Sequence, residues 1–110
     1  METRHLAAFL AVAHHGSFTA AARETYVDPS TLSRHVAALE RDLGVALFVR
    51  GQRSLRLTRE GAAFLPEAAG VLAAVGRARA AVRFRPASRP APARPVHEAD
   101  ALREPAARAS

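Results

Sequence analysis

Small hydroxyl side chains and an arginine lie close together near the middle of the chain. Ser30 and Thr31 come first, and Arg34 follows about one helical turn later. Short side chains at the tip of a helix let its backbone approach a DNA major groove closely, and the forked guanidinium of Arg34 can donate two hydrogen bonds to a guanine edge or a phosphate. This pattern favours contact with DNA. The alternative is an ordinary solvated helix face, although such a face usually carries more Glu, Lys and Gln.

The sequence predicts that a helix from Pro29 to about Leu43 positions these residues. Asp28 is a favoured N-cap, Pro29 is tolerated at the first helical position, and Gly44 is a typical helix end. At about 100° per residue, one narrow stripe faces the core and holds Leu32, Val36, Leu39 and Leu43. The opposite face holds Ser30, Arg34, Ala37, Ala38 and Arg41, with Ser33 at its edge.

Two shorter helices are predicted before this one. The first ends at Gly16 and Ser17, and its core side holds Leu6, Phe9, Leu10 and Ala13. The second follows Phe18, packs through Ala21 and Ala22, and ends near residue 27. Together the three helices predict a helix-turn-helix core, with the helix-turn-helix itself at about residues 18–37.

A basic hairpin is predicted after the third helix, at about residues 47–58. Its core side is expected to hold Val45, Leu47 and Phe48. A turn at 51–54 precedes an alternation typical of a half-buried strand, in the order Leu55, Arg56, Leu57 and Thr58. Within seven residues this ribbon carries Arg50, Arg53 and Arg56. A basic two-stranded ribbon beside a helix-turn-helix is a wing that can meet a DNA backbone or minor groove; a plain solvated hairpin is the alternative.

A long Ala-rich helix capped by Thr58 is predicted over residues 59–83. One side of it steps by three or four residues through Leu65, Ala68, Leu72, Val75, Arg79 and Val82. This is a coiled-coil seam interrupted at Arg79, and it predicts dimerisation through Leu65, Leu72, Val75 and Val82. Pro66 is expected either to kink the helix or to delay its regular start. Gly70 and Gly76 each weaken it by about 1 kcal/mol relative to Ala.

The composition limits the classes of function. The chain has 110 residues and a formal net charge of +6, so it holds one small domain with an appendage at most. It has no cysteine, which excludes disulfides, thiolate metal sites and cysteine nucleophiles, and a cytoplasmic location is expected. All 16 of its basic residues are arginine, a bias that suits phosphate and guanine and fits a GC-rich genome equally well.

Membrane, metal and enzyme functions are not expected. The longest apolar run, residues 6–13, has eight residues against about 20 for a membrane-spanning helix. The adjacent His14 and His15 would point about 100° apart on a helix, and no third metal ligand is evident. The chain shows no carboxylate pair, no nucleophile with a base and no glycine-rich phosphate loop, so neither catalysis nor a bound cofactor is expected.

The composition changes at residue 84. Residues 84–110 hold five of the seven prolines, many Ala and Arg, and no repeating apolar pattern. Such a segment cannot bury enough apolar surface to offset its ordering entropy, so a disordered tail is predicted.

Several motifs, in order, resemble the N-terminal part of LysR-type transcriptional regulators. They are Phe9-Leu10-Ala11-Val12-Ala13, Gly16-Ser17-Phe18-Thr19-Ala20-Ala21-Ala22, Leu32-Ser33-Arg34-His35-Val36, Leu39-Glu40, Leu43-Gly44-Val45, Leu47-Phe48-Val49-Arg50, Leu57-Thr58-Arg59-Glu60-Gly61 and Phe64-Leu65-Pro66-Glu67-Ala68. The resemblance is collinear over residues 2–83.

The resemblance implies a winged helix-turn-helix that binds duplex DNA as a dimer through its linker helix, usually at interrupted palindromes in promoters. It implies that Arg53 lies in the wing and that DNA is approached by Pro29, Ser30, Ser33 and Arg34. Family members normally continue into a large C-terminal domain that binds a small effector, and nothing after residue 84 resembles that domain.

Two residues depart from the family pattern. Pro29 stands where the family commonly has Gln, a frequent base contact, so base recognition is expected to shift to Ser30 and Arg34. Thr25 stands where the family prefers an apolar residue, typically Leu. A hydroxyl at that position must find a partner or cost about 1–3 kcal/mol.

The sequence therefore predicts a mainly α fold. Residues 1–58 form a winged helix-turn-helix with a three-helix core and a two-stranded β wing, residues 59–83 a linker and dimerisation helix, and residues 84–110 a tail. The expected function is sequence-specific binding of double-stranded promoter DNA by a homodimer that regulates transcription. The expected DNA contacts are Pro29, Ser30, Thr31, Ser33, Arg34, Arg50 and Arg53.

Two alternatives remain open. One is a winged helix of another regulator family, such as the molybdate-responsive type, whose N-terminal domain is similar. The other is a dimerisation module or fragment that pairs with full-length relatives through residues 59–83 and has no useful operator binding of its own.

Overall fold

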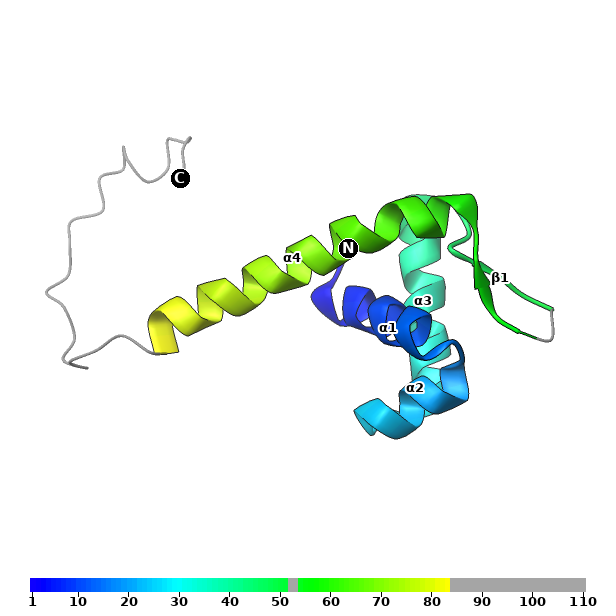
Figure 1. Cartoon of the computed structure of the whole chain (residues 1–110), viewed down its shortest axis with the longest axis horizontal. Coiled ribbons are helices and arrows are strands. Elements are labelled where there is room, and N and C mark those ends of the chain that lie inside the picture. Colours follow the sequence, from blue (N-terminus) through cyan, green and yellow to red (C-terminus); the bar gives the residue numbers. More distant parts are fainter. Residues whose placement is uncertain (52–53, 84–110) are drawn as a thin grey trace, which may run out of the picture.

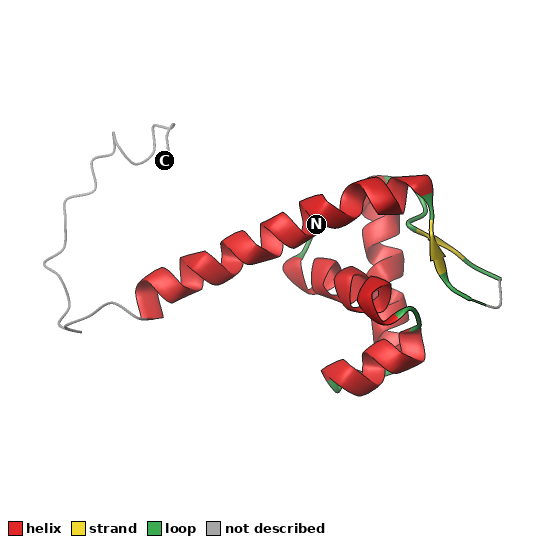
Figure 2. Cartoon of the chain, in the orientation of Figure 1, coloured by secondary structure: helices red, strands yellow, loops and turns green. Residues whose placement is uncertain are grey.

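The computed structural model describes residues 1–51 and 54–83, which form a helical body with one short sheet at its edge (Figure 1, Figure 2). The helices are α1 (Thr3–His15), α2 (Phe18–Thr25), α3 (Pro29–Leu43) and α4 (Arg59–Arg83), and the strands are β1 (Phe48–Val49) and β2 (Arg56–Leu57). This is the mainly helical winged helix-turn-helix that the sequence predicts. Arg53 and the predicted tail at 84–110 lie outside the described residues.

Local signals start and end the first three helices where the sequence predicts. Gly16 closes α1 in the left-handed conformation, with φ 76°, and Ser17 caps α2 by accepting a hydrogen bond from the N–H of Ala20 at 2.9 Å. Helix α2 ends at Thr25, and its C-cap Tyr26 lies within one residue of the predicted break. The φ of Tyr26, 58°, is uncommon for a residue with a side chain. Gly44 closes α3 with φ 76°.

The core lies between α1, α3 and the base of the wing. Its larger α1 and α3 side chains, each at most 3% exposed, are Leu6, Phe9, Val12, Leu32, Val36 and Leu39. The Phe9 ring centroid lies 5.4 Å from that of Phe48 in the wing and 5.6 Å from that of Phe64 in α4. The predicted apolar stripe of α3 is confirmed, with Leu43 partly buried at its end.

Val45 was expected in the core, and this prediction is wrong because the residue is 37% exposed. Gly44 turns the chain through the left-handed conformation, which leaves Val45 outside the body while Leu47 is fully buried. Val45 instead lines a shallow apolar groove together with Leu43 and Phe64.

The wing is shorter than the alternating pattern suggests. Its two strands pair antiparallel over two residues each, with Phe48 opposite Leu57 and Val49 opposite Arg56. Phe48 and Leu57 pack on the core, whereas Val49 and Arg56 are exposed. The predicted alternation therefore holds. A ladder this short is not stable by itself, so the wing depends on contacts with the helices for its position.

The long helix α4 begins at Arg59 and continues through Pro66. The sequence predicts that Pro66 either kinks this helix or delays its regular start. The delayed start is wrong, because the helix is already formed seven residues before Pro66. Thr58 caps the helix as predicted, because its hydroxyl accepts a hydrogen bond from the N–H of Gly61 at 2.9 Å. This bond fixes the first turn before the proline is reached.

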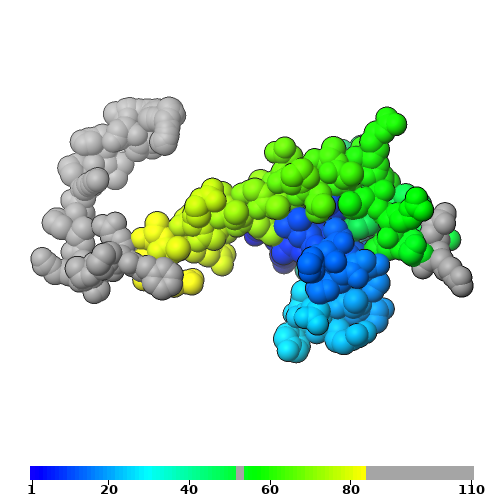
Figure 3. All heavy atoms as spheres, viewed as in Figure 1, coloured from blue at the N-terminus to red at the C-terminus, as the bar shows by residue number. Residues whose placement is uncertain are grey.

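One half of α4 is packed and the other is open. Ala68 is fully buried, and Leu65 and Leu72 pack at the margin of the core. Beyond them the helix leaves the body as an arm (Figure 3), and Val82 is 77% exposed. The predicted dimerisation seam is thus divided between an inner half that contacts this chain's own core and an outer half open to solvent.

Candidate nucleic-acid interface

The N-terminus of α3 is fixed by Asp28. One carboxylate oxygen of Asp28 accepts hydrogen bonds from the N–H of Ser30, at 3.0 Å, and from the Ser30 hydroxyl. The hydroxyl bond, followed by the backbone bonds, holds the pKa of Asp28 below its ordinary value. Because its proton is directed to Asp28, the Ser30 hydroxyl can offer only an acceptor to a partner.

Arg34 lies one turn further along the same face. Its Nη2 donates a hydrogen bond to Oγ1 of Thr31 at 3.0 Å, so the guanidinium lies along the helix toward its N-terminus. Its other N–H groups make no hydrogen bond within residues 1–51 and 54–83. The structure therefore brings Arg34, Thr31 and Ser30 together, with exposed Pro29 beside them and Ser33 half-buried at the edge.

The wing arginines have different surroundings. Nη2 of Arg50 lies 3.2 Å from Oε1 of Glu40 in an ion pair, and the guanidinium stacks 5.4 Å from the centre of the Phe18 ring at the start of α2. Arg50 thus links α2, α3 and the wing, while 43% of its side chain stays exposed. Arg56 is exposed on the outer side of β2.

Sequence reasoning assigned no role to Glu40, which joins α3 to the wing. Its second carboxylate oxygen, Oε2, accepts hydrogen bonds from the backbone N–H of Leu47 at 2.7 Å and of Phe48 at 3.3 Å. The side chain of Glu40 is only 16% exposed. These bonds replace the ladder that a two-residue strand lacks, so Glu40 sets where the wing begins relative to α3.

The wing is also attached to α4. The Thr58 hydroxyl donates to the carbonyl of Ala46 at 2.7 Å, and the Thr58 N–H donates to the carbonyl of Leu47 at 2.9 Å. Gly61 lies so close that a Cβ atom there would be 2.1 Å from the same Leu47 oxygen. The absence of a side chain at Gly61 therefore allows α4 to lie directly on the segment before β1.

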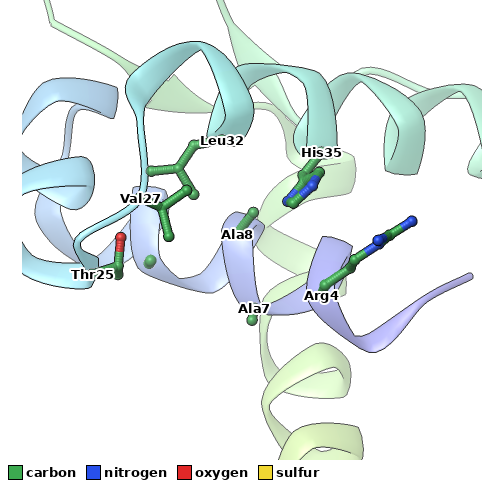
Figure 4. Close-up of a pocket in the computed structure, with 8 residues that line it drawn as sticks. Arg4, Ala7, Ala8, Thr25, Val27, Leu32 and His35 are labelled. Atoms are coloured by element: carbon green, nitrogen blue, oxygen red, sulfur yellow. The ribbon is translucent and has the colours of Figure 1, made fainter.

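Thr25 satisfies its own polar group. Its hydroxyl donates to the carbonyl of Ala21 at 2.8 Å, so the cost of an unpaired hydroxyl is avoided. Beside it, between α1 and α3, an apolar hollow of about 200 Å³ is open to the surface (Figure 4).

His35 occupies the side of α3 that faces α1. Its ring centroid lies 5.1 Å from that of His5. Burial, and then the neighbouring His5, Arg4 and Arg34, lower the pKa of His35 below its ordinary 6.5. The imidazole is accordingly neutral at pH 7.

In the part of the chain that the structure describes, no group of three or more His, Cys, Asp or Glu residues is placed to hold a metal ion. Over the same residues, no helix combines the length and apolar character needed to cross a membrane.

A three-helix core, a short wing and a third helix that is open to solvent at its N-terminus define a winged helix-turn-helix domain. The family model described as "Bacterial regulatory helix-turn-helix protein, lysR family" matches residues 3–62, more than half of the chain. The chain belongs to this LysR family.

Similar curated proteins are named as regulators of transcription. The regulator ClcR of Pseudomonas putida is 44% identical over 89 residues, which cover 81% of this chain and 30% of ClcR. The activator AmpR of Citrobacter freundii is 54% identical over 61 residues, which cover 56% of this chain and 21% of AmpR. The chain therefore spans less than a third of the length of these relatives.

Similar solved structures include DNA complexes. The DNA-binding domain of BenM, solved with catB site 1 DNA, is 37% identical with a TM-score of 0.72, over 76% of this chain and 92% of that one. The DNA-binding domain of CbnR, solved with DNA, is 42% identical with a TM-score of 0.71, over 76% of this chain and 95% of that one.

Proposed function

We propose that this chain is a sequence-specific transcription regulator that binds double-stranded DNA, with α3 in the major groove and the wing at the backbone or minor groove. The exposed N-terminal face of α3, on which Thr31 holds the Arg34 guanidinium at 3.0 Å, carries this proposal. The same fold was solved with DNA for the BenM and CbnR domains, at 37% and 42% identity, which supports it.

The residues on this face have different parts in the proposed contact. Arg34 supplies the donors for a guanine edge or a phosphate, and Ser30 supplies an acceptor for a base amino group. Pro29 has no side-chain donor, which leaves these two residues to carry most of the base recognition. The full proposed set is Pro29, Ser30, Thr31, Ser33, Arg34, Arg50 and Arg53.

Arg50 and Arg53 are proposed to contact phosphates. Arg50 is held by Glu40 and Phe18, so it offers charge at the base of the wing and little reach. Arg53, which lies outside the described residues, is proposed to neutralise one phosphate and so release one counterion.

The proposed active form is a homodimer in the bacterial cytoplasm. In this form residues 1–58 bind DNA and residues 59–83 pair two chains. The proposed pairing residues are Leu65, Leu72, Val75 and Val82, and the 77% exposure of Val82 supports pairing along the outer half. Leu65 and Leu72 support the junction between this helix and the core.

The test of the proposal is a selection of bound sequences from random duplex DNA at two salt concentrations. An enriched inverted repeat that survives moderate salt is expected. Binding that ignores sequence and collapses with salt would contradict sequence-specific recognition, because backbone contacts alone give that behaviour.

The Arg34→Ala variant then tests the interface itself. On the selected duplex it should lose about 1–3 kcal/mol of binding free energy and relax discrimination at one base position. The matched control is Arg41→Ala, in the exposed last turn of the same helix, which should change binding little. An equal loss on every sequence would move Arg34 from a base to a phosphate.

A second candidate function is that of a dimerisation module that pairs with full-length relatives. The exposed apolar residues on the outer half of α4 favour it. Sedimentation of this chain mixed with a full-length LysR-family protein distinguishes the two candidates. A tight mixed dimer together with negligible DNA binding by this chain alone would favour the module.

A further inference from the structure

A hollow of about 200 Å³ lies between α1 and α3 and under the turn that joins α2 to α3 (Figure 4). Its walls are apolar and consist of Ala7, Ala8, Ala11, Val27 and Leu32. Thr25 closes one end, and Arg4 and His35 stand at the other, as Figure 4 shows. The site is separate from the proposed DNA-binding face, which lies at the N-terminus of α3.

The hollow follows from the small side chains that line it. Three alanines form its α1 wall, and Thr25 stands at one end. The Thr25 hydroxyl is turned back to the Ala21 carbonyl, so the side chain neither fills the space nor offers it a polar group. The walls of this hollow offer water few hydrogen-bond partners, so covering them with an apolar group is favourable.

We propose that this hollow binds a small organic carboxylate with an apolar body of about one six-membered ring, its carboxylate lying at the Arg4 and His35 end. The volume agrees with this class, because an apolar protein cavity of about 150 Å³ accommodates benzene. A body of this size covers the alanine wall, and the charged end points to the rim.

Charge at the rim selects an anion. The Arg4 guanidinium lies 3.0 Å from Glu2, but both side chains are more than half exposed, so exchanging Glu2 for a ligand carboxylate costs little. His35 can donate a hydrogen bond beside it. A cationic ligand is disfavoured because its charge would lie close to the like charge of Arg4.

Protonation provides a second signature. The groups that face His35 are Glu2 just before α1, Arg4 and His5 in α1, and Arg34 in its own helix. Together with burial, their net effect keeps the pKa of His35 low. A bound carboxylate would raise that pKa again, so binding takes up a proton. The affinity for the carboxylate should therefore increase as the pH falls from 7.5 to 6.

The test uses phenylacetate as the probe on the whole chain without DNA, with neutral phenylacetamide as its uncharged match. A dissociation constant on the order of 1 mM is expected for a ligand of this size. At a phenylacetate concentration about ten times this dissociation constant, the thermal midpoint should rise by about 6–10 °C. Phenylacetamide should produce a clearly smaller rise.

Filling variants show whether the effect comes from the hollow. Thr25→Leu should raise the midpoint of the free protein and abolish the shift with phenylacetate. Ala11→Leu fills the same space from α1 and serves if the first variant does not fold. Arg4→Gln should reduce the phenylacetate shift to that of the amide.

Three results would overturn the proposal. They are no shift at 20 mM phenylacetate, an unchanged shift in the filled variants, or equal shifts with the acid and the amide. Because the assay contains no DNA, none of these results bears on the proposed regulator function.

Discussion

Replacing Glu40 with Ala removes one carboxylate that serves three donors. The backbone N–H groups of Leu47 and Phe48 lose their acceptor, at 2.7 and 3.3 Å, and Arg50 loses its ion-pair partner. Leu47 and Phe48 are 0% and 4% exposed, so water cannot readily replace the lost acceptor. The wing is then held by its two-residue ladder, the Thr58 bonds and the packing of Phe48 and Leu57 on the core.

The free-energy cost can be worked out from these contacts. The short, charge-assisted bond to Leu47 should contribute about 2 kcal/mol and the longer bond to Phe48 about 1 kcal/mol. The half-exposed Arg50 pair adds about 0.5 kcal/mol at most. Glu40→Ala should therefore reduce the free energy of unfolding by about 3 kcal/mol, a large part of the total for a small domain.

Urea unfolding followed by circular dichroism at pH 7 measures this loss, at one protein concentration because association would add to the stability. The midpoint should fall by about 2–3 M. Glu40→Gln keeps one oxygen for the Leu47 N–H and should lose only about 1 kcal/mol. The matched control is Glu24→Ala, because Glu24 is an exposed residue of α2. Its urea midpoint should lie near that of the wild type.

Two outcomes would refute this reasoning. If Glu40→Ala unfolds within about 0.5 kcal/mol of the wild type, the wing is held by other contacts. If Glu40→Gln loses as much stability as the alanine variant, the charge of Glu40 and its pair with Arg50 hold the wing, and the acceptor for the backbone N–H groups does not.

Three further predictions concern packing, pH and salt. Gly61→Ala should lower the free energy of unfolding by about 3 kcal/mol, because its Cβ would lie 2.1 Å from the Leu47 oxygen. Gly70→Ala has open space around it and should raise the free energy of unfolding by about 1 kcal/mol. Equal effects of the two variants on the thermal midpoint would contradict the close contact at Gly61. Because the pKa of His35 is lowered in the folded protein, the stability that its neutral form contributes above pH 6.5 is lost as the pH falls from 6.5 toward the folded-state pKa. The thermal midpoint of His35→Gln should therefore fall less steeply than that of the wild type between pH 7.5 and 5.5. Arg53→Ala should reduce the slope of log affinity against log salt by about one unit, and an unchanged slope would remove Arg53 from the interface.

The features that could be predicted from sequence depend on neighbouring residues. Asp28 caps α3 through a bond to Ser30, two positions away, and Gly44 ends the same helix. The face that holds Ser30 and Arg34 is set by the 3.6-residue period of a single helix. Because these interactions are local, both the helix and the composition of its outer face follow from the order of the residues alone.

The features that could not be predicted depend on how separate segments meet. Glu40 reaches the N–H of Leu47 only after the chain has turned at Gly44, and the same turn leaves Val45 exposed. A hydrophobic pattern shows that Val45 is apolar but not that the backbone directs it outward. Arg50 could be recognised as a cation near DNA, whereas its pairing with Glu40 required the folded wing.

The stripe of α4 shows the same limit. Its period identifies one apolar side, but not which part of that side the protein covers itself. Ala68 is buried because α1 supplies a surface from the far end of the sequence, and Val82 lies beyond that surface. Similarly, Thr25 could be recognised as a departure from the family pattern, while the hollow beside it depends on the alanines of α1.

The length of α4 also sets a distance in the proposed dimer. Its 25 residues rise about 1.5 Å each, about 37 Å in all. In the proposed two-fold dimer, the point at which two such helices cross sets the distance between the two recognition helices. Moving the crossing by one turn on each helix changes that distance by about 11 Å, or roughly three base pairs. The spacing between the half-sites of an operator would then be determined by residues on a helix that itself touches no base.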